Sequence, residues 1–194
     1  MSVDPSTAHP GGTARPVGGT GSSPPRPVYA SVTAGELETH YARAGRGSPA
    51  LFVARVAQPF EWPEQSLACS MAATHRVTVA HPPDPAETQH GFASWLLGLL
   101  DGLGIVRTAL VATGEHALHA LHFALQHGER IERLALVGCD PVTIEGVVLG
   151  DVGDGTSADR VPLLILPGTL QHPNASDRNA LALFLAGERV DGAG

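Results

Sequence analysis

The sequence predicts an α/β fold with a doubly wound, mostly parallel sheet, and two patterns support this prediction. From Val28 onward, short apolar segments alternate with longer segments whose apolar residues recur at helical spacing. The later short segments are apolar on both faces, as parallel strands must be when helices cover both sides of the sheet. In such a sheet the ligand site lies beyond the carboxyl ends of the strands.

The expected elements occupy the chain from 28 to 188. In chain order they are a hairpin of strands over 28–34 and 37–45, a strand over 50–56, a helix over 63–75, a strand over 76–81, a helix over 88–104, a strand over 107–113, a helix over 115–127, a strand over 133–138, a strand over 161–168 and a helix over 176–188. The Gly- and Asp-rich stretch 142–160 is expected to be mostly loop.

Local signals indicate where several of these elements begin and end. Gly35 and Glu36 separate two segments that alternate apolar and polar residues, as in a hairpin. Thr88 is expected to cap the amino end of one helix, and Gly104 stands near its carboxyl end. Gly128 is expected to close the next helix.

Composition narrows the class of protein. Residues 1–27 are rich in Pro, Gly, Ser and Thr and are expected to be a disordered tail, with one domain over 28–194. No apolar run approaches the roughly 18 residues that span a membrane. A net charge of −7 with scattered arginines argues against a nucleic-acid surface. Two cysteines, Cys69 and Cys139, favour a reducing cytoplasm without disulfides.

Six segments occur in an order that resembles one known family. They are THYARAGRGSPALFVARV at 39–56, EW at 61–62, THRVTVAHPPD at 74–84, LLDGLGIVRTALVATG at 99–114, ALHFALQHGERIERLALVGCDPV at 120–142 and VPLLILPGT at 161–169. The chain resembles the α/β-hydrolase superfamily, especially its epoxide-hydrolase and haloperoxidase-like esterase branch. The resemblance implies a sharp strand-to-helix turn with the signature G-x-S-x-G, or with Asp in place of Ser, and the nucleophile at its tip.

The nucleophile position of that signature has no reactive side chain in this sequence. Aligning Leu110 and Val111 with the strand places Ala112, Gly114 and His116 at the three signature positions. Glycine adopts a strained turn at little cost, but it has no atom that attacks a substrate. The turn therefore keeps its expected shape and loses its inherited nucleophile.

Four further features of the family are also altered. The loop that usually reads His-Gly reads Ala54-Arg55-Val56, and the position of the acid falls near Leu170. The family histidine follows one more strand, which this sequence is not expected to form, and too few residues separate 142 from 161 for a lid domain. We expect a truncated α/β-hydrolase core without the last strand and lid, and no Ser-His-Asp hydrolysis.

Other chemistry is conceivable at the same strand ends. Arg55 could grip a carboxylate or enolate oxygen, and His81 follows the strand over 76–81. Glu115 and His116 open the helix after the turn, where the helix dipole favours a carboxylate and a neutral imidazole. These four are the candidate catalytic residues. The candidate binding residues are Thr113, Gly114, Cys139 and Asp140.

Structural roles stand beside each of these interpretations. Glu115 and His116 suit the first turn of a helix without any catalysis, and His81 before Pro82 suits a strand end. Arg55 turns away from the pocket if the strand register shifts by one residue. A metal site of His81, His116 and His119 is an alternative, although the sequence has no metal-binding motif and no cofactor is expected.

Three functions therefore remain at this point. The first is a non-hydrolytic enzyme of a bacterial biosynthetic pathway, such as a cyclase, lyase or isomerase, that uses acid–base chemistry on a small molecule. The second is a catalytically dead small-molecule binder or structural partner. The third is a residual esterase with Thr113 or Cys139 as nucleophile. Because the apolar strand over 161–168 would lie at the sheet edge, a homodimer through residues 161–190 is also expected.

Overall fold

A seven-stranded sheet with helices on both faces forms the core of the computed structural model, which describes residues 26–54, 62, 66–83, 91–139, 161–167 and 173–187. The elements are β1 (Val28–Ala34), β2 (Leu37–Ala44), β3 (Pro49–Val53), α1 (Leu67–Met71), β4 (Arg76–Ala80), α2 (Gly91–Gly102), β5 (Thr108–Thr113), α3 (Ala117–Gln126), β6 (Ile131–Val137), β7 (Leu163–Leu166) and α5 (Ala175–Ala186), with single 3₁₀ turns η1 (Gly114–His116) and η2 (Gly128–Arg130).

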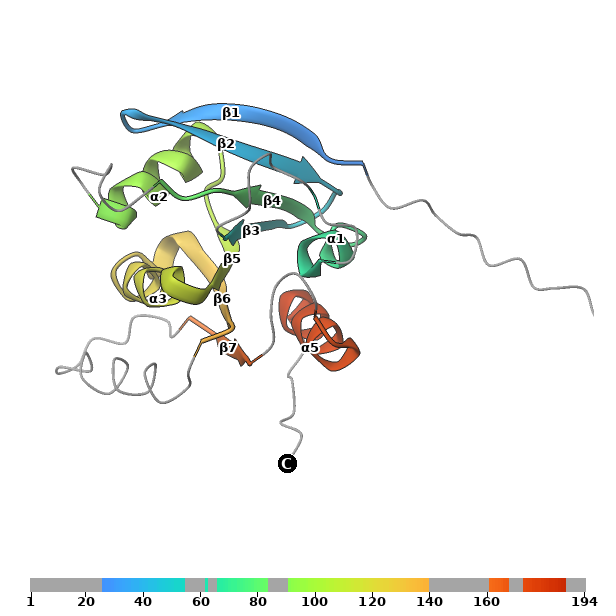
Figure 1. Ribbon diagram of the computed structural model, residues 1–194. Helices are drawn as coiled ribbons and strands as arrows, with labels where there is room; N and C mark the ends of the chain where they lie inside the picture. Colours follow the sequence, from blue (N-terminus) through green and yellow to red (C-terminus); the bar gives the residue numbers. More distant parts are fainter. Residues whose placement is uncertain are drawn as a thin grey trace, which may run out of the picture.

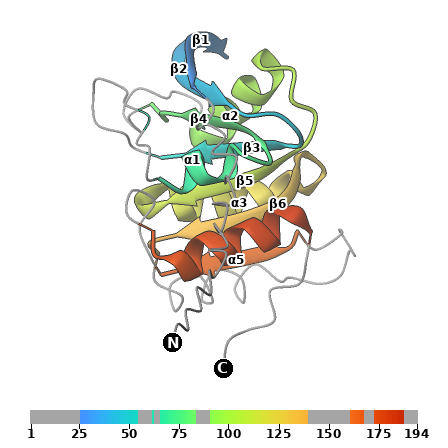
Figure 2. The same ribbon diagram turned by 90° about the vertical axis from the view of Figure 1, so that its right-hand side faces the viewer.

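The strand order confirms the predicted doubly wound sheet. It runs β1-β2-β4-β3-β5-β6-β7; β1 and β2 are antiparallel, and β3 to β7 are parallel to one another. Helices α2 and α3 lie on one face and α1 and α5 on the other (Figure 1). In the rotated view α5 crosses in front of the last strands, with α1 above it (Figure 2).

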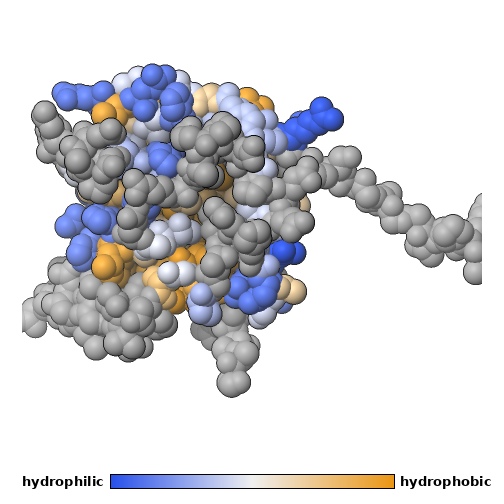
Figure 3. Space-filling view, in the orientation of Figure 1, coloured by the Kyte–Doolittle hydropathy of each residue, from blue (hydrophilic) through white to orange (hydrophobic). Residues whose placement is uncertain are grey.

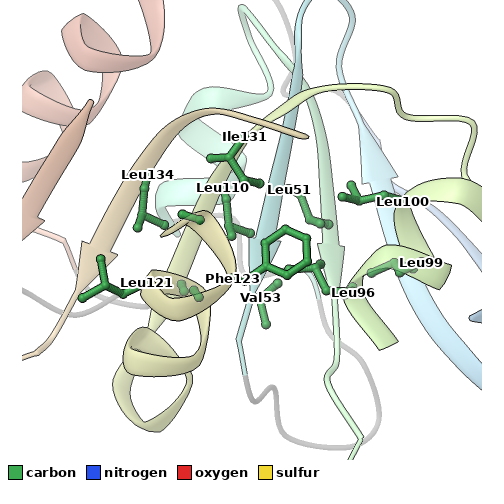
Figure 4. Close-up of a cluster of buried hydrophobic side chains, with 14 of the residues drawn as sticks. Leu51, Val53, Leu96, Leu99, Leu100, Leu110, Leu121, Phe123, Ile131 and Leu134 are labelled. Atoms are coloured by element: carbon green, nitrogen blue, oxygen red, sulfur yellow. The ribbon is translucent and has the colours of Figure 1, made fainter. Parts of the chain in front are cut away.

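The central strands are buried on both faces, so alternate side chains of one strand enter different cores. Leu51 and Val53 of β3 pack toward α2 and α3, whereas Phe52 packs toward α1 and α5. On the first face, Phe123 of α3 lies among aliphatic side chains from β3, β5 and α2 (Figure 4). This two-sided burial explains the continuous apolar runs of the sequence.

The predicted elements are present wherever the structure describes their residues, with two corrections. Within the described part of the helix expected over 63–75, only α1 is helical: the Ser66 hydroxyl accepts a hydrogen bond from the Cys69 N–H at 3.1 Å and caps its amino end, and residues 72–74 form a turn. The helix expected over 115–127 opens with the tighter turn η1, so α3 begins at Ala117. The expected tail, the Thr88 cap and the loop over 142–160 lie outside the described residues.

A half-buried arginine fastens the loop between α2 and β5. The Nε of Arg130 donates to the Val106 carbonyl at 2.9 Å, and its Nη2 donates to the Ile105 carbonyl at 3.1 Å and to Asp101 Oδ1 at 2.7 Å. Since guanidinium groups present several donors in a fixed plane, one side chain satisfies both carbonyls of this connection. The loop leads directly into β5, the strand before the candidate site.

Helix α2 packs against the β1–β2 hairpin without room for a side chain at Gly98. A Cβ at Gly98 would lie 2.5 Å from the Gly35 nitrogen and 2.9 Å from the Ala34 carbonyl carbon. These are backbone atoms, so they cannot move aside by a rotamer change. Glycine in the middle of this helix is therefore explained by close approach of the two backbones.

Replacing Gly98 with Ala is expected to lower the free energy of unfolding by about 1–3 kcal/mol, because the new methyl group overlaps the hairpin backbone. Urea denaturation measures the loss. Ser94→Ala, at an exposed position of the same helix, is the matched control and should stay within about 0.5 kcal/mol of the wild type. Equal effects of the two substitutions would contradict the close packing.

Arg130→Ala is expected to destabilise the protein by about 1.5–3 kcal/mol, because two loop carbonyls lose a charged donor. Arg107→Ala is the control, since exposed Arg107 makes only a 3.4 Å contact with the Ile131 carbonyl. Thermal unfolding of both variants decides the matter: a change of Tm no larger for Arg130→Ala than for Arg107→Ala would refute the role of Arg130.

Candidate functional site

The carboxyl ends of the parallel strands share one edge of the sheet, where the sequence places the candidate residues. The register aligns Val53 of β3 with Ala80 of β4 and with Ala112 of β5. His81 thus follows β4 at the level where Thr113 ends β5. Two strand spacings of about 4.8 Å separate these strands, so the two backbones lie roughly 10 Å apart.

The turn after β5 has the sharp geometry predicted for it. Thr113 has extended backbone angles, with φ −126° and ψ 147°, and the next residue, Gly114, has φ +55°. The chain then makes the 3₁₀ turn η1, in which the N–H of Ala117 bonds to the Gly114 carbonyl, before α3 begins. Gly114 supplies the left-handed conformation that turns a strand directly into a helix.

The space over Gly114 is open among the atoms of the structure. Gly114 is exposed, and a Cβ built on it would meet no heavy atom of the described residues within 4 Å, its chain neighbours aside. A side chain would fit there sterically and would lie at the carboxyl edge of the sheet. Glycine leaves that position without a nucleophile and exposes its backbone at the same place.

His116 lies in an aromatic cluster between α2 and α3. It is only 6% exposed, and its ring stacks on Phe92 with centroids 6.2 Å apart and planes 13° apart. Phe92 also contacts His119 at 5.6 Å and Trp95 at 5.4 Å. His116 therefore packs against Phe92 as well as opening the helix, and its ring is covered on the side that faces Phe92.

This aromatic cluster continues to strand β2 through a buried hydrogen bond. The Trp95 indole N–H donates to the Thr39 hydroxyl at 2.9 Å, and both side chains are buried. Phe92 and Trp95 are neighbours of the turn that were not predicted from the sequence. Their i, i+3 spacing on one helix was the available signal.

The remaining candidates are placed only in part. His81 is half-buried, and its backbone N–H donates to the His40 carbonyl at 3.4 Å. Cys139 is half-buried after β6. The side chain of Glu115, and the whole of Arg55 and Asp140, lie outside the described part of the chain, so their convergence on one cavity remains a prediction.

The metal alternative is not formed. His81, His116 and His119 all belong to the described residues, and no three His, Cys, Asp or Glu side chains of those residues gather to hold a metal ion. His119 and His122 are exposed on α3, whereas His127 packs its ring on Phe123 at 4.8 Å. The histidine run of this helix is therefore spread around its circumference.

Comparison with known proteins identifies the fold. No family model and no curated protein matches the sequence. The CarC serine hydrolase of carbazole degradation matches with a TM-score of 0.52 and 21% identity, over 62% of this chain and 51% of that one. The chain has the α/β-hydrolase fold.

An epoxide hydrolase from Vigna radiata gives a TM-score of 0.49 at 18% identity, over 64% of this chain and 47% of that one. A meta-cleavage product hydrolase from Pseudomonas fluorescens gives 0.47 at 21% identity, over 56% and 44%. The chain spans about half the length of these solved structures. The resemblance stated from the sequence is confirmed at the level of fold.

Among the described helices, none has the length and apolar character of a membrane span.

Gly114→Ala is expected to cost about 1–2 kcal/mol of stability, because an L-residue is strained at φ +55° while its methyl group meets no neighbour. Gly104→Ala is the matched comparison, since Gly104 has φ +64° and equally open surroundings. Chemical denaturation should give similar losses for both. A stabilising Gly114→Ala would contradict the left-handed turn.

Proposed function

We propose that this protein is a non-hydrolytic α/β-hydrolase-fold protein that holds a small molecule over Gly114 without forming a covalent bond to it. The observation that supports the proposal is Gly114 itself: the turn has a left-handed residue at its tip, glycine has no side chain that could attack a substrate, and a Cβ built there would meet no atom of the described residues beyond its chain neighbours within 4 Å. Ligands of open α/β sheets bind beyond the carboxyl ends of the strands, which is where this space lies.

Binding without turnover is the role that the surroundings of Gly114 favour. A general base must reach the proton that it abstracts, and His116, the candidate imidazole at the turn, is buried against Phe92. Its imidazole then serves packing between α2 and α3. A ligand over Gly114 would meet backbone groups of the turn, which bind and orient without reacting.

Acid–base catalysis by a cyclase, lyase or isomerase is the second candidate, and the position of His81 favours it. His81 is half-buried at the end of β4, about two strand spacings from the turn, within the span of a small substrate. Arg55 and Glu115 would join it under this hypothesis. His81→Gln separates the two functions, because it should abolish turnover in an enzyme and leave affinity unchanged in a binder.

Cysteine scanning tests the open space directly. In a Cys139→Ser background, Gly114→Cys is expected to react with 5,5′-dithiobis(2-nitrobenzoate) in the folded protein, because the side chain enters open space. Ala112→Cys is the matched control and should stay unreactive, since Ala112 is fully buried in β5. Buried Cys69 provides an internal reference. An unreactive Cys at 114 would show a closed site and overturn the proposal.

Reactivity of the wild-type protein tests the absence of covalent chemistry. A fluorophosphonate and iodoacetamide should leave Thr113 and Cys139 unmodified at equimolar reagent, and 4-nitrophenyl acetate should not be hydrolysed above the buffer rate. An adduct at either residue together with turnover would establish the residual esterase instead.

Ligands are then sought in a panel of small carboxylic acids, esters and epoxides, with the Gly114 amide resonance as readout.

A further inference from the structure

We propose that the outer edge of β7 pairs with β7 of a second copy of this chain, in antiparallel orientation, so that two sheets join into one. β7 is the last strand in the order, and among the residues that the structure describes only β6 pairs with it. The proposal rests on the sheet alone and does not depend on what binds over Gly114.

The backbone of β7 presents hydrogen-bonding groups at this edge. The carbonyls of Pro162 and Leu166 accept hydrogen bonds from Leu134 and Gly138 at 2.8 Å, so both point toward β6. Because peptide groups alternate along a strand, Leu164 also faces β6, whereas the N–H and C=O of Leu163 and Ile165 face outward. Backbone groups of a strand edge with which no described residue pairs are a template for another strand.

The side chains of β7 are apolar on both faces of the sheet. Ile165 packs toward α2 and α3, Leu164 and Leu166 pack toward α1 and α5, and Leu163 is 38% exposed. The lower half of the molecule, where β6 and β7 lie, shows hydrophobic side chains between the grey segments (Figure 3). The opposite edge strand, β1, carries polar Ser31 and Thr33 at exposed positions, together with exposed Val28 and Tyr29.

Charge favours a second copy as the occupant of this edge. The protein has a net charge of −7, so two copies repel each other over most of their surfaces. The described residues 161–167 contain no charged side chain, and 173–187 contain only Asp177, which is buried, and Arg178. The edge of β7 and the adjoining helix thus form a nearly uncharged surface on an acidic protein.

The sequence of β7 is compatible with a two-fold axis. If the axis passes beside Leu164, Leu163 of each copy lies opposite Ile165 of the other. Leu163 and Ile165 both direct their N–H and C=O outward, so these two pairs are hydrogen-bonded pairs and the central Leu164 pair is not, as antiparallel geometry requires. Helix α5 of each copy then lies on the same face of the joined sheet, beside its symmetry mate.

The test measures the molar mass of the full chain by sedimentation between about 1 and 100 μM, where a dimer and its dissociation are both visible by mass action. The wild type is expected to be a dimer. Leu163→Lys should raise its dissociation constant by about tenfold or more, because the ammonium group would face an apolar partner strand. Val106→Lys is the matched control: Val106 is 81% exposed and lies away from β7, so its substitution should leave the dimer intact.

Hydrogen exchange identifies what covers the edge. In a dimer paired as proposed, the Leu163 and Ile165 amides are protected at high concentration and exchange rapidly on dilution or in Leu163→Lys. The amides of Leu164 and Leu166, which face β6, should stay protected throughout. A monomer at every concentration, equal effects of the two lysine substitutions, or protection of Leu163 and Ile165 that is independent of concentration would overturn the proposal; the last result would mean that the chain covers its own edge.

Discussion

Burial of β3 and β5 on both faces is the constraint on which the rest of the structure depends. Leu51 and Phe52 of β3, and Leu110 and Val111 of β5, are fully buried, and each successive residue enters the opposite core. A strand of this kind has no solvent face and requires helices on both sides. The order of the elements follows from that requirement, because each crossover returns a helix to cover the strands.

The turn after β5 is a consequence of the same burial. β5 ends at the carboxyl end of the parallel strands, and the chain must reverse there within a few residues so that Phe123 of α3 packs over Leu51 and Leu110. A left-handed residue makes that reversal within one position, which Gly114 does at φ +55°. The shape of the turn is therefore required by packing, independently of any reaction that such a turn supports in other proteins.

Apolar periodicity was sufficient to predict the sheet and its helices, since burial on both faces leaves a direct trace in the sequence. It could not predict where α1 begins, which depends on the Ser66 hydroxyl reaching one particular N–H. The candidate site was harder for a related reason. Placing Gly114 needed only the end of a strand, whereas the stacking of His116 on Phe92 depends on how two helices pack across the sheet face. The spacing of residues in one sequence does not encode how far apart two helices pack.

This division separates the residues that shape the turn from residues that would react there. A reacting side chain at a strand end need not pack into either core. Gly114, by contrast, is held by the path of the backbone, and His116 by its ring contact with Phe92 between two helices. Buried side chains that pack together are retained because a single core substitution lowers the free energy of unfolding by several kcal/mol. His116, a polar residue beside this turn, is thus accounted for by packing.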